Sequence, residues 1–225
     1  MIADPAFILF IMCLQPGYTT KHLSVAAMSY QPFHDHEYSL LHLIAHHFPN
    51  KLATVSLRPH LIWGPGDNHL LPRLVARARA GQLARIGARA KLIDTVYVDN
   101  AAEAHLLAAE RLAPGSPVAG KVYFISQGEP LPLWEMVARL LAAAGAPPVT
   151  RTVPVWLAMA LALGFETAHR VTGNPGEPRL TRFVVHELST AHWFDISAAR
   201  RDLGYAPGVS IAEGLERLRR YLATS

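Results

Sequence analysis

The 225-residue chain has little of what defines several protein classes. Its single cysteine, Cys13, cannot form a disulfide within the chain, which excludes a disulfide scaffold and favours a reducing compartment such as the cytoplasm. Charged residues make up only 17% of the sequence and hydrophobic residues 51%, so the composition also excludes intrinsic disorder and a collagen-like repeat. A chain of this length and composition can bury a core of its own.

The sequence also lacks the signature of a nucleic-acid-binding protein. The formal net charge is +4, but the arginines that produce it are scattered among acidic residues. No nucleic-acid-binding motif and no interleaving of basic with aromatic residues accompanies them. We therefore expect no nucleic-acid partner.

Long hydrophobic runs are absent as well, because neither of two apolar stretches reaches the roughly 20 residues that a membrane-spanning helix needs. Residues 6–14 indicate a buried strand or core helix, with a secretory signal as the alternative. Residues 153–165 indicate a helix that covers the core or a substrate pocket. Because Trp156, Arg151 and Arg170 flank this stretch, peripheral contact with a membrane surface is the alternative. We expect a cytoplasmic protein, with membrane association left open by this stretch.

The chain divides into two regions of different character at about residue 52. Residues 1–51 are irregular, rich in histidine and poor in helix caps. Residues 52–225 alternate strand patterns with helical patterns, which predicts an α/β layer architecture. The expected strands are 52–63, ending near Pro59, 92–98 and 121–126, and the expected helices are 70–80, 100–112, 133–144, 197–204 and 210–221.

Several helix starts are predicted from residues that cap a helix. Asp67 or Asn68 is expected to cap the helix that begins near residue 70. Asn100 with Glu103, and Ser210 with the glutamate three positions later, have the spacing of a capping box. These caps place the first turn of each helix.

Three stretches of the second region resemble one family of enzymes. Residues 57–67 (LRPHLIWGPGD) combine a strand, an Arg-Pro pair and a Trp-Gly-Pro-Gly turn. Residues 94–100 (DTVYVDN) precede an Ala-His pair, and residues 194–207 contain Phe-Asp and Leu-Gly-Tyr-Ala-Pro. In this order and spacing they resemble the C-terminal half of extended short-chain dehydrogenases/reductases. The subfamily they resemble is that of the 3-beta-hydroxysteroid dehydrogenases, which includes bacterial reductases of 2-alkyl-3-oxoalkanoic acids.

The resemblance implies the C-terminal part of an extended Rossmann-type α/β fold, with most of the nucleotide-binding half missing and the substrate-binding region within residues 52–225. It implies NAD or NADP as cofactor and hydride transfer at the CH–OH group of a steroid or long-chain 3-oxo/3-hydroxy acid, which is a small apolar substrate. The apolar composition of residues 131–165 fits a substrate pocket and a core equally well. The resemblance also assigns three residues whose backbone contacts the nicotinamide and four that face the substrate: Pro59, His60 and Leu61, and Trp63, Asp67, Asn68 and His69.

Two motifs of this family are absent from the sequence. No Gly-x-x-Gly-x-x-Gly turn is present to hold the pyrophosphate, since Gly17 is the only glycine before Gly64. No Tyr-x-x-x-Lys pair is present either, because the candidates Tyr18 and Lys21 are three positions apart rather than four. We therefore predict a truncated, inactive family member in which residues 1–51 replace the Rossmann half. The strand beginning near residue 52 would lose sheet neighbours from that half, which favours self-association through an open edge.

A histidine cluster at residues 34–47 allows another interpretation. His42 and His46 would share one face of a helix, as two metal ligands do, although a solvated histidine-rich helix explains the same spacing. Three interpretations of the chain therefore stay open: an NAD(P)-dependent oxidoreductase, a non-catalytic interaction remnant, and a metal-binding protein.

Overall fold

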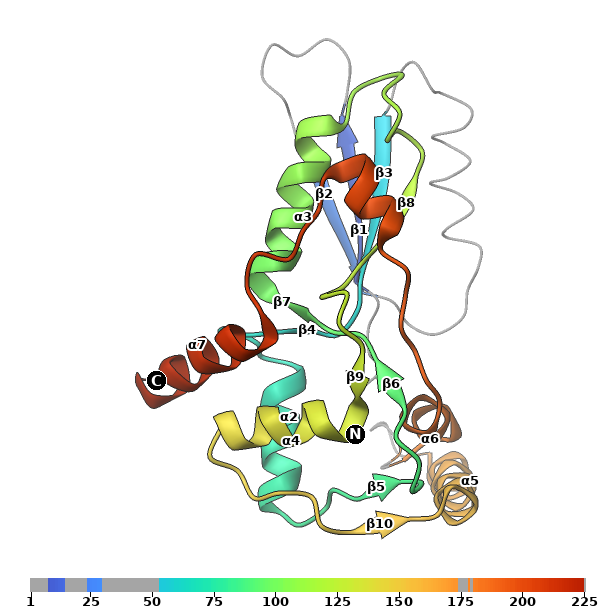
Figure 1. Cartoon of the computed structure of the whole chain (residues 1–225). Helices are drawn as coiled ribbons and strands as arrows, with labels where there is room; N and C mark the ends of the chain where they lie inside the picture. Colours follow the sequence, from blue (N-terminus) through green and yellow to red (C-terminus); the bar gives the residue numbers. More distant parts are fainter. Residues whose placement is uncertain (1–7, 15–23, 30–52, 174–177, 179, 225) are drawn as a thin grey trace.

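The computed structural model describes residues 8–14, 24–29, 53–173, 178 and 180–224, and it places them in a mixed α/β fold (Figure 1). The Tyr18–Lys21 pair and the His42–His46 pair of the sequence analysis lie outside these residues. The elements in chain order are β1 (Ile8–Leu14), β2 (Ser24–Ser29), β3 (Ala53–Pro59), β4 (Ile62–Trp63), α2 (Leu70–Arg79), β5 (Arg85–Ile86), β6 (Leu92–Ile93), β7 (Val96–Tyr97), α3 (Val98–Arg111), β8 (Val122–Ile125), β9 (Leu131–Pro132), α4 (Leu133–Ala143), β10 (Thr152–Val153), α5 (Val155–Thr172), α6 (Arg182–Ser189), η1 (Ala199–Leu203) and α7 (Ile211–Thr224).

A four-stranded sheet in the order β2-β1-β3-β8 forms the upper part of the molecule in Figure 1. β3 runs parallel to β8, with Leu57 opposite Tyr123, and antiparallel to β1, with Leu57 opposite Phe10. The predicted open edge at β3 is therefore wrong, because residues 8–14 supply a strand beside it. Self-association stays a prediction.

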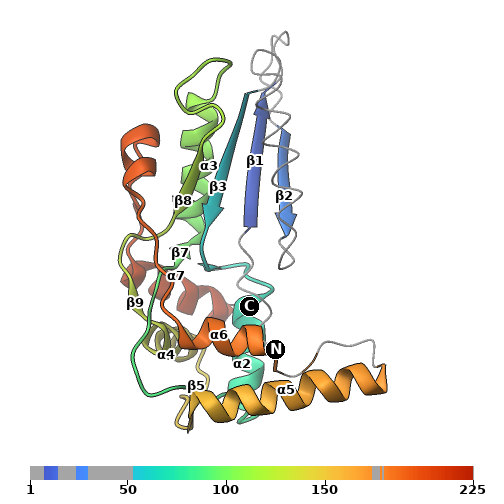
Figure 2. The same ribbon diagram turned by 90° about the vertical axis from the view of Figure 1, so that its right-hand side faces the viewer.

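The helix α3 packs along this sheet (Figure 2). β3 points alternate side chains into the core, and its Val55 and Leu57 are fully buried. α3 presents small residues to them, Ala101, Ala104 and Ala108, at the spacing that puts them on one helix face. Small side chains on that face let the helix axis lie close to the sheet.

A second core lies below the sheet in Figure 1, between α2, α4 and α7. α4 buries Leu133, Met136, Val137 and Leu140, which follow the i, i+3, i+4, i+7 pattern of an amphipathic helix. The predicted helices over residues 70–80 and 133–144 are thus confirmed to within a residue. The predicted strand over 92–98 is instead two short strands, β6 and β7, and its last residue already belongs to α3.

Gly214 in α7 packs directly against two buried aromatic rings. A Cβ at this position would lie 2.7 Å from Tyr97 and 2.9 Å from Trp63, and both rings are buried and pack edge to face. These rings have no room to move, so glycine is required here by packing rather than by backbone conformation.

We expect Gly214→Ala to lower the free energy of unfolding by about 1–2 kcal/mol, because overpacking outweighs the better helix propensity of alanine. Gly164→Ala, within exposed α5, is the matched control, because a Cβ there meets no atom within 4 Å. That substitution should raise the free energy of unfolding by about 0.5–1 kcal/mol. Urea denaturation of the two variants measures both changes, and equal effects would contradict the packing explanation.

Candidate functional site

The candidate site begins where β3 ends. Pro59 is the last residue of β3, and the chain then turns through Leu61 into the short strand β4. Leu61 has a φ of +45°, the left-handed region that a leucine rarely adopts, while its carbonyl accepts a hydrogen bond from the Val96 N–H at 3.2 Å. Backbone strain of this kind persists where the surrounding structure holds it, and such positions gather at ligand sites.

The side chain of His60 is enclosed directly behind this turn. Its Nδ1 lies 2.8 Å from the carbonyl oxygen of Asp94, and its ring meets the rings of Phe194 and His192 edge to face. The main-chain N–H of His60 donates to the carbonyl of Ile125 at 3.1 Å. Both the ring and the N–H of His60 therefore serve the packing of this corner.

Burial controls the ionisation of the groups around His60. It lowers the pKa of His60 from 6.5 to about 4, and the nearby imidazole of His192 adds to this effect. Burial raises the pKa of the Asp94 carboxyl, although that carboxyl accepts a 2.7 Å hydrogen bond from the Phe194 N–H. His60 is thus a neutral imidazole at neutral pH.

An apolar pocket opens beside the turn. Leu61 and Trp63 form the wall nearest β3, and α2, α4 and α6 form the other walls. Nearly all of its surface is carbon: besides Leu61 and Trp63 the lining consists of Leu70, Leu74, Ile93, Thr95, Leu133, Met136, Val137, Leu140, Val184, Glu187, Leu188 and His192. A pocket of this composition suits an apolar ligand with few polar groups.

The few polar side chains of the lining hold one another in place. The Trp63 indole N–H donates to the Thr95 hydroxyl oxygen at 3.2 Å. A hydroxyl that accepts such a bond still has its own proton to donate. On the α6 side, His192 Nε2 lies 2.6 Å from the backbone oxygen of Glu187 and 3.5 Å from its carboxylate. Thr95, Glu187 and His192 are therefore the polar residues of the lining, although almost none of the surface that faces the pocket is polar.

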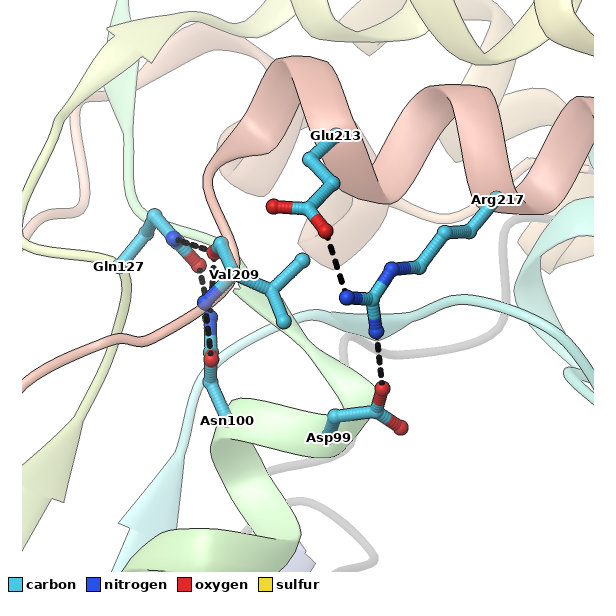
Figure 3. A network of polar contacts seen from close by, with 6 residues as sticks. All are labelled: Asp99, Asn100, Gln127, Val209, Glu213 and Arg217. Carbon is cyan, nitrogen blue, oxygen red and sulfur yellow. Dashed lines mark hydrogen bonds and ion pairs between the residues drawn. The ribbon is translucent and has the colours of Figure 1, made fainter.

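A buried amide network ties α3 and the segment after β8 to the C-terminal segment (Figure 3). Asn100 accepts a hydrogen bond from the Val209 N–H at 2.9 Å and donates to the Val209 carbonyl at 2.8 Å. Its amide also donates to Gln127 at 3.0 Å. Asn100 is therefore not the cap of α3, as its spacing to Glu103 predicted, because α3 already begins at Val98 and the amide bonds across the fold instead.

The structure separates the seven residues that sequence resemblance assigned to cofactor and substrate. Leu61 and Trp63 line the pocket, whereas Pro59, His60, Asp67, Asn68 and His69 are not among its lining residues. The Asp67 carboxylate instead accepts the backbone N–H groups of His69, Leu70 and Leu71 at 2.8–2.9 Å, as a cap of α2 does. The ligand roles of these seven residues stay predictions.

Sequence reasoning missed Thr95, Glu187 and His192 as pocket residues. Thr95 lies within residues 94–100, where nothing in the sequence distinguishes it as a pocket residue. The sequence of α6 did not show a pattern from which a helix was predicted. The apolar face of α4 was readable from its spacing and does line the pocket. The stretch 153–165, which was expected to cover a pocket or the core, contributes no lining residue.

Within the part of the chain that the structure describes, no group of three or more histidine, cysteine, aspartate or glutamate side chains is placed to hold a metal ion. None of the helices described there is long and apolar enough to cross a bilayer.

Comparison with known proteins identifies relatives of this chain. The profile of the 3-beta hydroxysteroid dehydrogenase/isomerase family matches residues 44–155. The chain is 53% identical over 169 residues to a 2-alkyl-3-oxoalkanoate reductase of Shewanella oneidensis, covering 75% of this chain and 44% of the reductase. It is 41% identical over 175 residues to a 3beta-hydroxysteroid-dehydrogenase/decarboxylase of Arabidopsis thaliana, covering 75% and 31%. The chain thus spans about half or less of the length of these relatives.

Solved structures agree on the fold. An epimerase from Methanothermobacter thermautotrophicus superimposes with a TM-score of 0.56 at 20% identity, covering 87% of this chain and 55% of the epimerase. A UDP-glucuronic acid 4-epimerase from Bacillus cereus gives 0.55 at 20% identity, covering 89% and 55%. These likenesses confirm the predicted fold, part of an extended Rossmann-type enzyme. The chain belongs to the 3-beta hydroxysteroid dehydrogenase/isomerase family.

Proposed function

We propose that this chain forms the substrate-side part of an NAD(P)-dependent oxidoreductase that acts on the CH–OH or keto group of an apolar molecule. The observation that carries the proposal is the apolar pocket whose first wall, Leu61 and Trp63, follows directly after the carboxyl end of β3. In open α/β sheets, ligands bind at the carboxyl ends of the strands. The names of the relatives favour two substrate classes, the 3beta-hydroxysteroids and the 2-alkyl-3-oxoalkanoates.

The turn after β3 fits the nicotinamide end of the cofactor. The backbone of Pro59 and Leu61 lies at the carboxyl end of a central strand, and Leu61 holds a strained conformation there. The N–H of His60 is bonded to Ile125, so contact from this residue would not use that group. A bound nicotinamide would supply or accept the hydride. The chain offers no glycine-rich turn for the pyrophosphate, so these residues fit one end of the cofactor only.

The pocket can orient a substrate through one polar contact while it buries the apolar part. The Thr95 hydroxyl, fixed by the Trp63 indole, can donate its proton to a keto oxygen at the pocket wall. The side chains of α4 and α6 would surround the hydrocarbon and exclude water. Removing this apolar surface from water favours binding.

We expect the purified 225-residue chain to bind such molecules without turning them over. The chain contains no Tyr-x-x-x-Lys pair, and general acid catalysis typically contributes about 10²–10⁴ to the rate. Tryptophan fluorescence titration with a 3β-hydroxysteroid and a long-chain 3-hydroxy acid measures binding, and NADH or NADPH absorbance measures turnover. Turnover of order 1 per second with either nicotinamide would contradict the inactivity, whereas absence of binding would contradict the pocket assignment.

A pocket-filling variant tests the location of the binding site. Leu188 of α6 lines the pocket and is only partly buried, so Leu188→Trp should fill the cavity and weaken binding at least about tenfold. Leu106→Trp is the matched control, because Leu106 is an exposed leucine on α3, away from the pocket. Equal binding by both variants would place the ligand elsewhere.

A further inference from the structure

The indole of Trp63 separates the apolar pocket from the C-terminal helix α7. Trp63 lines the pocket, whereas Tyr97 and the residues of α7 are not among the lining residues. The Tyr97 ring nevertheless packs edge to face on the Trp63 ring, with the two centroids 5.2 Å apart. The backbone of Gly214 in α7 also reaches the indole, because a Cβ there would lie 2.9 Å from Cη2 of Trp63. Tyr97 and Gly214 therefore support the pocket wall from behind.

α7 is held in place on both sides of Gly214. Ile211 and Leu218, one turn before and one turn after it, are buried in the same apolar core as Trp63. Val209, which precedes the helix, is bonded through its N–H and its carbonyl to the Asn100 amide (Figure 3). α7 therefore cannot move away from the pocket wall without breaking buried contacts.

The space behind the Trp63 ring is full. Tyr97 is buried, and its ring lies so close to the backbone that a Cβ at Gly64 would be 3.1 Å from it and a Cβ at Gly214 2.7 Å. The indole N–H is bonded to the Thr95 hydroxyl at 3.2 Å, which holds the five-membered end of the ring. A side chain at position 214 could thus be accommodated only at the expense of the pocket, by tilting the six-membered end of the indole into it.

The size of this tilt follows from ordinary packing distances. Non-bonded carbon atoms pack best at about 3.5–4.0 Å, so the ring would have to advance by roughly 0.5–1 Å to clear a Cβ that now lies 2.9 Å away. Interiors are packed closely enough that a change of one methyl group is felt. A glycine on a helix that does not line the pocket therefore controls the position of one pocket wall.

We propose that Gly214 is a specificity-determining position, because its missing side chain keeps Trp63 back and leaves the pocket wide enough for a broad, rigid hydrocarbon body such as the fused rings of a steroid. This inference rests on the proposed function of the pocket. A single alkyl chain is flexible and can bend past a wall that has advanced slightly, whereas a fused-ring body cannot. Apolar pockets discriminate between ligands that differ by one methylene by about 10–200-fold.

Equilibrium dialysis of the purified full chain against two ligands tests the proposal. The broad ligand is a 3β-hydroxysteroid and the narrow one an unbranched long-chain 3-hydroxy acid. We expect Gly214→Ala to weaken steroid binding at least about tenfold and binding of the acid less than about threefold. Gly164→Ala is the matched control, because a Cβ there meets no atom within 4 Å, and it should bind both ligands as the unmodified chain does.

The ratio of the two affinities separates this role from a loss of stability. Unfolded chain binds neither ligand, so partial unfolding would weaken both equally and leave the ratio unchanged. A second comparison removes the wall itself, because phenylalanine lacks the part of the indole that a Cβ at position 214 would meet. Trp63→Phe/Gly214→Ala should therefore bind the steroid within about threefold of Trp63→Phe alone.

Two outcomes would overturn the role of Gly214 while the pocket assignment stands. The first is that Gly214→Ala changes the affinities for both ligands by the same factor or changes neither. The second is that Gly214→Ala weakens steroid binding as much in the Trp63→Phe background as in the unmodified chain, because the added methyl group would then act without Trp63. If the unmodified chain binds neither ligand, the proposed function of the pocket fails and the role of Gly214 with it.

Discussion

Replacing Asn100 by alanine is expected to lower the free energy of unfolding by about 2–4 kcal/mol. The amide of Asn100 accepts the Val209 N–H and donates to Gln127 inside the fold, where no water reaches these groups. Its removal leaves the Val209 N–H buried without its acceptor, which costs about 1–3 kcal/mol, in addition to the lost hydrogen bonds. The Val209 carbonyl still accepts a hydrogen bond from Gln127 in the variant. The expected loss of stability therefore comes mainly from the Val209 N–H, which has lost its acceptor.

The adjacent Asp99 provides the control for this prediction. Asp99 also bonds to the C-terminal segment, through the Arg217 guanidinium at 3.0 Å, but the Asp99 side chain is 57% exposed and that of Arg217 39% (Figure 3). Asp99→Ala should therefore lower the free energy of unfolding by less than about 1 kcal/mol. Urea denaturation at neutral pH compares the two variants. If Asn100→Ala is no less stable than Asp99→Ala, the buried network does not hold the C-terminal segment to α3.

Acidification from pH 7 to pH 4 is expected to remove about 3 kcal/mol of stability through His60 alone. Burial lowers the pKa of His60 from 6.5 to about 4 in the folded chain, so the unfolded chain binds a proton more readily between these values. The contribution of His60 to the free energy of unfolding is therefore fully present above about pH 6.5. It is lost as the pH falls towards 4, by about 1.4 kcal/mol for each pH unit between the two pKa values. Asp94 acts in the opposite sense, because its raised pKa favours protonation of the folded state and offsets part of the loss.

The variant His60→Gln should flatten this pH dependence, because it removes the buried titrating group. His69→Gln is the matched control, because it makes the same substitution at an exposed histidine at the start of α2. The measurement is the free energy of unfolding in urea at pH 7, 5.5 and 4. A slope as steep in His60→Gln as in the unmodified chain would show that another group controls acid stability.

Local sequence patterns predicted those elements whose signals lie within a single segment. The apolar run of β3 and the spacing of apolar residues in α4 are examples. Burial of such an element places its apolar residues at positions that can be recognised within the segment itself. Asp67 was predicted to cap a helix from its position alone, and its carboxylate accepts the N–H of His69 and the first two N–H groups of α2. The capping prediction for Asn100 was wrong because its bonding partner, Val209, lies 109 positions along the chain.

The sequence by itself determined the family, the α/β class and the presence of an apolar segment near residues 153–165, because each depends on residues close together in the chain. Only the tertiary structure decided which strands flank β3, which side chains line the pocket, and that α5 points its apolar face outward. The physical reason is that pairing and burial depend on partners remote in sequence. The sequence of an apolar stretch does not show whether other elements of the fold cover its side chains. The tertiary structure shows that α5 packs on α6 through buried alanines and leaves Trp156 exposed.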